Sequence, residues 1–248
     1  MLDRLIVVFF RIVSGLFQLL PLSLACWIGR MIGVFVYLTN RRRQVAYVNL
    51  KAAFGTRFSV DERKQIVKNN FSHLAQNIVE VFRFPKMDKR FMERYVSFTH
   101  FERYRDAVSE HKGAIFLTPH FGNWEMTQIV SGLLGTPLHV LARRQNRDRL
   151  NDFLDELRAS GGAVTVHKGQ GLRSLYKVLL AKGSIGTLGD LSGGKEGMVI
   201  DFFGRKTTAP HGIFQIAQRT QATVLPCFDV RTKGPYHHIF FEIGRAHV

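Results

Sequence analysis

The chain has 248 residues, of which 46% are hydrophobic and 22% charged, a composition that excludes wholesale disorder and allows one sizeable core. Its 35 Lys and Arg against 19 Asp and Glu give a net charge of +16, which predicts anionic partners: nucleic acid, acidic lipid headgroups or an acidic carrier protein. The two cysteines, Cys26 and Cys227, lie in apolar stretches and form neither a disulfide framework nor a zinc-ligand pattern.

Residues 1–45 are predicted to form a membrane-associated helical segment. The uncharged run from Ile12 to Gly29 approaches the ~20 residues that cross a bilayer. Pro21 would break a continuous helix, so a helical hairpin or an interfacial helix pair fits the pattern as well as a true span does. The cluster from Arg41 to Arg43 then predicts that the rest of the chain lies on the cytoplasmic side of an inner membrane.

Residues 46–242 are predicted to form an α/β domain. A long amphipathic helix is expected from Asp61 to Phe84, where Pro85 ends it. Short β-rich runs then alternate with helical stretches. The expected strands are 114–118, 138–142, 163–166, 184–188, 199–203, 223–228 and 238–242, and the expected helices are 124–134, 147–160, 172–181 and 211–219. This alternation predicts a mixed sheet flanked by helices, with ligands outside the carboxyl ends of the strands.

The sharpest local signal is Thr118-Pro-His120-Phe-Gly-Asn-Trp-Glu125, which follows a predicted strand and precedes a predicted helix. The spacing of His120 and Glu125 suits a loop that folds the carboxylate back toward the imidazole. Such a pair can act as a general base and its orienting group. From the spacing alone, the alternative of an ordinary loop histidine followed by a first-turn helix acid stays open.

The segment from His120 to Glu125 resembles the His-x4-Asp/Glu motif of glycerolipid acyltransferases. The wider match is to their bacterial branch, the lipid A late acyltransferases and the phosphatidylinositol mannoside acyltransferases, and it covers nearly the whole chain. In chain order it rests on Leu20-Pro-Leu22, Arg41 to Arg43, Asn49-Leu-x3-Phe54-Gly55, His120 to Glu125, Arg143-x2-Asn146, Asp190, and Phe202-Phe-Gly204 through Pro210-x-Gly212. Leu191 and Ser192 depart from the Asp-Gln-Asp common in the lipid A branch, which leaves the acceptor open.

The resemblance implies transfer of a fatty acyl group from acyl carrier protein, or from acyl-CoA, to a hydroxyl of a lipid A precursor or a related membrane glycolipid. It implies direct attack by that hydroxyl, with His120 and Glu125 as the catalytic residues and no metal or cofactor beside the thioester co-substrate. Substrate binding would fall to Asn123, Arg143, Asn146, Asp190, Gly204 and Thr208. The guanidinium of Arg143 suits a phosphate group, because it can bind two oxygens at once.

The implied partners are acyl carrier protein, the lipid or glycolipid acceptor and an anionic membrane surface. The alternative is a catalytically inactive, membrane-anchored lipid-binding or scaffold protein of the same fold. No nucleic acid is expected, because the chain has no recognised nucleic-acid module. Residues 243–248, followed by a stop codon, match one reading frame of a sequencing adapter. We therefore expect a non-native tail there and a natural protein that continues beyond about Glu242.

Overall fold

The computed structural model describes residues 2–109, 112–142, 146–167 and 171–242. The chain begins with two apolar helices, α1 (Leu2–Leu19) and α2 (Leu22–Thr39), which Pro21 separates. The uncharged run 12–29 therefore belongs to two helices, as expected where a proline removes a backbone donor. Among the described helices, α2 is the one whose length and composition would suffice to cross a membrane.

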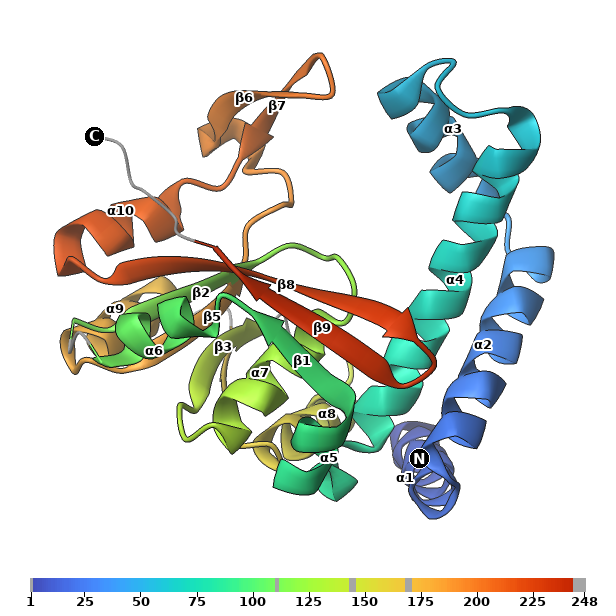
Figure 1. The fold of residues 1–248 in the computed structure, drawn as a ribbon, viewed down its shortest axis with the longest axis horizontal. Helices are drawn as coiled ribbons and strands as arrows, with labels where there is room; N and C mark the ends of the chain where they lie inside the picture. Colours follow the sequence, from blue (N-terminus) through green and yellow to red (C-terminus); the bar gives the residue numbers. More distant parts are fainter. Residues whose placement is uncertain (1, 110–111, 143–145, 168–170, 243–248) are drawn as a thin grey trace.

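The long helix α4 (Val60–Phe82) contacts both α1 and α2, and the three lie together at one side of the molecule (Figure 1). The side chain of Ser59 accepts a hydrogen bond from the backbone of Glu62, whose own side chain bonds back to Ser59, so a capping box starts the helix. Its apolar residues do not all face inward. Ile66, Leu74 and Ile78 are exposed, whereas Gln76, Asn77 and Glu80 are buried.

Seven strands form one mixed sheet in the order β1-β9-β8-β2-β5-β3-β4, while β6 and β7 form a separate hairpin (Figure 1). Strands β8, β2, β5, β3 and β4 are parallel, and β9 runs antiparallel to β8 and parallel to β1. All seven predicted strands are present, and β1 and β7 are additional. The strands are β1 (Val96–Thr99), β2 (Ala114–Thr118), β3 (Leu138–Ala142), β4 (Val164–His167), β5 (Ser184–Leu188), β6 (Met198–Phe202), β7 (Arg205–Ala209), β8 (Thr223–Lys233) and β9 (Tyr236–Phe241).

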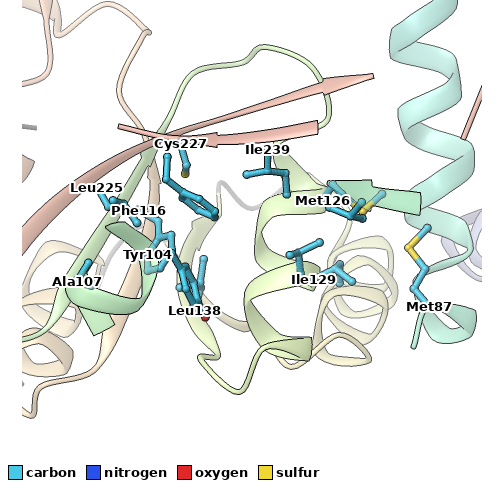
Figure 2. Close-up of a cluster of buried hydrophobic side chains, with 14 of the residues drawn as sticks. Met87, Tyr104, Ala107, Phe116, Met126, Ile129, Leu138, Leu225, Cys227 and Ile239 are labelled. Carbon is cyan, nitrogen blue, oxygen red and sulfur yellow. The ribbon is translucent and has the colours of Figure 1, made fainter. Parts of the chain in front are cut away.

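Helices cover both faces of the sheet, because its buried strands alternate their side chains between the two. From β2, Phe116 packs with Tyr104 and Ile129 on one face (Figure 2), and Ile115 packs with Leu175 and Ile216 on the other. The predicted class, a mixed sheet flanked by helices, is confirmed. The four helices predicted in this part of the chain are present, and α3, α5 and α6 are additional. The bounds are α3 (Arg42–Phe54), α5 (Lys89–Tyr95), α6 (Phe101–Ser109), α7 (Trp124–Leu133), α8 (Asp148–Ala159), α9 (Gly171–Leu180) and α10 (Gly212–Thr220).

Candidate active site

Two neighbouring parallel strands, β2 and β5, end beside the candidate site. Thr118 lies opposite Leu188 in their register, so the residues two positions further on, His120 and Asp190, leave the sheet edge side by side. His120 Nδ1 lies 2.7 Å from Asp190 Oδ1, and the His120 backbone N–H donates to Asp190 Oδ2 at 2.9 Å. The two side chains are 33% and 37% exposed, so the pair is open to solvent.

One carboxylate thus holds both the main chain and the ring of His120. When Nδ1–H donates to Asp190, the other ring nitrogen, Nε2, is left as the proton acceptor. The indole of Trp124 and the imidazole pack in a T-shaped arrangement, with 5.1 Å between the ring centroids. This is the arrangement of a general base and its orienting group.

The expected pairing of His120 with Glu125 is not what the structure gives. The Glu125 carboxylate accepts hydrogen bonds from Arg158 of α8 at 2.8 and 3.0 Å, and a further one from Gln128. The reason is local: Glu125 lies in the first turn of α7, and its side chain extends toward α8 rather than back over the loop. Burial lowers the pKa of the Arg158 guanidinium, but the bond to Glu125 and the charges of Glu125 and Asp155 outweigh it and raise that pKa.

A cavity of about 220 Å³ lies next to the pair of His120 and Asp190. Trp124 lines this cavity and also packs against His120. Apolar side chains from the sheet and α8 form much of the wall: Phe116, Leu138, Val140, Leu141 and Leu154. The ion pair of Glu125 and Arg158 lines it as well. The cavity can therefore take an apolar chain and offers fixed charges along one part of its wall.

The structure brings only some of the predicted substrate-binding residues to this site. Asp190 is at its centre, as the partner of His120, and Thr208 is joined to the segment after Asp190 by a 3.1 Å contact with the Ser192 hydroxyl. Gly204 is in the turn of the β6–β7 hairpin, and Asn146 is exposed in a bend. Arg143 lies outside the described residues.

Asn123 is 1% exposed and faces the protein interior, so its predicted contact with substrate is replaced by contacts with the fold. Its backbone N–H donates to Asp229 and its side-chain amide donates to Glu80. Sequence reasoning missed both carboxylates. Two signals in the sequence could have indicated them. Asp229 is a charged residue within an apolar strand, and Glu80 is an acid near the end of a long amphipathic helix.

The fold and site together define an α/β protein with a histidine–aspartate pair at the carboxyl edge of a sheet and a partly apolar cavity beside it. Within the described residues, no group of three or more His, Cys, Asp or Glu side chains could hold a metal ion. The family described as bacterial lipid A biosynthesis acyltransferase matches residues 1–243, and the chain belongs to that family.

Individual relatives are distant. The chain is 24% identical to a lipid A biosynthesis acyltransferase of Haemophilus influenzae, over 83% of this chain and 63% of that protein. It is 25% identical to a phosphatidylinositol mannoside acyltransferase of Mycolicibacterium smegmatis, over 67% of this chain and 56% of that protein. A second phosphatidylinositol mannoside acyltransferase, from Mycobacterium tuberculosis, is 28% identical over 59% of this chain and 48% of that protein. The chain thus spans about half to two thirds of the length of these relatives.

Proposed function

We propose that the protein transfers a fatty acyl group from a thioester to a hydroxyl of a membrane glycolipid, with His120 as the general base and Asp190 as its orienting group. The observation that carries the proposal is the two-point contact of one carboxylate with the ring and the backbone of His120. Membership of the acyltransferase family supports the reaction class, and the cavity beside Trp124 supports an apolar substrate.

The chemical step needs one proton acceptor near the thioester. Nε2 of His120 takes the proton of the acceptor hydroxyl while its oxygen adds to the thioester carbonyl. The carbon–sulfur bond then breaks, and the imidazolium returns the proton to the departing thiolate. Asp190 stabilises the imidazolium between these two events. No covalent acyl-enzyme is required.

We assign the acyl chain to the cavity lined by β2, β3 and α8. Its apolar wall favours a hydrocarbon, and Trp124 would place the carbonyl end of that chain close to His120. Glu125 then contributes through Arg158, because their ion pair braces α7 against α8 at this wall.

The two N-terminal helices support a position at a membrane. On α1 the exposed apolar side chains recur at intervals of three and four residues, and α2 carries a similar stripe. These are Leu5, Val8, Phe9, Ile12, Leu16 and Leu19 on α1, and Leu24, Trp27, Met31, Ile32, Phe35 and Leu38 on α2. Exposed stripes of this length favour an apolar environment, and the charge of +16 favours an anionic surface. We place the protein at the inner membrane with its sheet on the cytoplasmic side.

The test is transfer of a labelled acyl group by the purified protein in lipid nanodiscs, followed by mass spectrometry of the lipids. Acyl carrier protein thioesters and acyl-CoA are offered as separate donors, with lipid A precursors and phosphatidylinositol mannosides as separate acceptors. We expect transfer from at least one pair, and a loss of about 10³-fold or more in His120→Ala. Asp190→Asn should lose about 10²-fold or more, because the amide cannot stabilise the imidazolium.

His238→Ala is the matched control, because His238 lies on β9 and bonds to Ser97 and Thr99 rather than to the site. Its activity should stay within about twofold of the wild type. Equal activity of the wild type and the His120 variant would refute the mechanism. Lipid binding without any transfer would favour the scaffold alternative.

A further inference from the structure

Four charged side chains lie buried next to the loop that carries His120. Glu80 comes from α4, Asp229 and Arg231 from β8, and His237 from β9. His237 Nδ1 lies 2.9 Å from both oxygens of Asp229, and its Nε2 lies 3.0 Å from Glu80 Oε1. Arg231 donates to both oxygens of Glu80. We call Glu80, Asp229, Arg231 and His237 the buried quartet.

The quartet is balanced in charge, with two carboxylates facing two cations. Burial would raise the pKa of Glu80, but His237 and Arg231 outweigh it and lower that pKa to about 2. Burial would lower the pKa of His237, but Glu80 and Asp229 outweigh it and raise that pKa to about 9. Glu80 and His237 are therefore both ionised near neutral pH. Burying this many charges is costly, and well-packed apolar residues would often stabilise a fold as much or more.

Two members of the quartet also bond to Asn123 in the turn that follows His120, and Asn77 bonds both to Arg231 of the quartet and to Gly122. The Asn123 backbone N–H donates to Asp229 Oδ2 at 2.9 Å, and its side-chain amide donates to Glu80 Oε2 at 2.7 Å. One turn before Glu80 on α4, Asn77 donates to the Gly122 carbonyl at 2.5 Å and accepts from Arg231 at 2.8 Å. Three hydrogen bonds thus fix two consecutive residues of the loop.

The turn has no room to move toward β8. Gly122 has a φ of +60°, and a Cβ atom there would lie 1.7 Å from the Asp229 carbonyl oxygen. On the other side of the same loop, the His120 backbone is held by Asp190. The loop is therefore held at both ends. Asp190, which follows β5, bonds to His120, and the quartet bonds to Asn123.

We propose that the buried quartet and Asn77 fix the position of the 119–124 loop. They thereby orient the His120 side chain toward the reacting hydroxyl. This inference rests on the proposed function. A loop of so few residues transmits a shift of Asn123 directly to His120, and misplacement of a catalytic group by about 1 Å can cost about 10²-fold in rate. Asn77 and the quartet are positioning residues, because they act on the reaction only through the loop.

The test compares Asn77→Ala with Val79→Ala. Both lie on α4 and both are buried, but Val79 lies against Gly29 of α2 and makes no hydrogen bond with the loop. We expect Asn77→Ala to lower kcat at least tenfold while KM changes less than threefold. Val79→Ala should lower the melting temperature and keep kcat within twofold of the wild type. Asn77→Ser, a milder change, is measured in parallel so that a folded variant is in hand.

Hydrogen–deuterium exchange of the peptide covering residues 119–125 gives a second readout that needs no turnover. Exchange there should be faster in the Asn77 variants and unchanged in Val79→Ala. The proposal is overturned if the folded Asn77 variants keep wild-type kcat and loop protection, or if kcat falls in step with melting temperature in all variants. If the wild type transfers no acyl group to any acceptor, the proposed function fails, and the exchange result still decides whether Asn77 holds the loop.

Discussion

Raising the pH should weaken the fold through one residue, His237. Its side chain is fully buried, and the charged groups that face it are Glu80 of α4 and Asp229 and Arg231 of β8. Although burial opposes the charged ring, the two carboxylates raise its pKa from the ordinary 6.5 to about 9. The folded protein therefore keeps a proton on His237 that the unfolded chain releases above pH 6.5.

The sign and size follow from that difference. A raised pKa adds stability that is fully present below pH 6.5 and is lost as the pH rises toward 9. Between these values the unfolded chain binds one proton fewer, so the free energy of unfolding should fall by about 1.4 kcal/mol per pH unit. From pH 6.5 to 8.5 the loss is about 2–3 kcal/mol, a large part of the 5–15 kcal/mol typical of a domain.

Urea unfolding of the detergent-solubilised protein, followed by tryptophan fluorescence at several pH values, measures this loss. The scan ends at pH 8.5, because burial raises the pKa of the Cys227 thiol from 9.0 to about 12, which adds a separate loss in more alkaline solution. His238→Gln, on the same strand, should keep the wild-type slope. His237→Gln should be less stable at pH 6.5 but nearly flat across the scan. A wild-type slope as flat as that of His237→Gln would mean a neutral ring and would refute the reasoning.

Two further predictions concern the packing around the site. Gly122→Ala should abolish activity and lower the yield of folded protein, because the added Cβ would overlap the Asp229 carbonyl. The control is Gly135→Ala, where φ is also positive but the added Cβ meets no atom within 4 Å. It should lower the free energy of unfolding in urea by only about 1–2 kcal/mol. Arg158→Met should lower the free energy of unfolding by about 2–3 kcal/mol, less than for a fully buried pair because both side chains are 16–18% exposed. The double change Arg158→Met with Glu125→Met should recover most of that loss, and no recovery would show that the ion pair is not its source.

The sequence was sufficient for most of the elements and for the position of His120. Apolar runs predicted β2 and β5 with the bounds that the structure has, and they placed His120 just beyond the end of a strand. The sequence was not sufficient for the partner of His120. Asp190 follows β5 by two residues as His120 follows β2, but this equivalence matters only because β5 is paired directly with β2. Strand order depends on the packing of the whole sheet, and a local pattern does not contain it.

The same limit explains why Glu125 was assigned to His120. Spacing along the chain suggested a loop that closes on itself, whereas the structure satisfies Glu125 with a cation from α8, 33 residues away. The partners of His237 show the same limit. Asp229 comes from the neighbouring strand β8, but Glu80 comes from α4, 157 residues away in the chain. Burial and charge partners of this kind arise only from tertiary contacts.

The helix α4 connects the apolar N-terminal helices to the site. At Gly33 of α2 an added Cβ would lie 2.4 Å from the Ser72 Cα, so the two backbones meet without side chains between them. One to two turns further along α4 are Asn77 and Glu80, which hold the turn next to His120. The helix α4 thus contacts both α2 and the loop that carries His120. The packing of α2 and the position of the loop that carries His120 therefore both depend on the same helix.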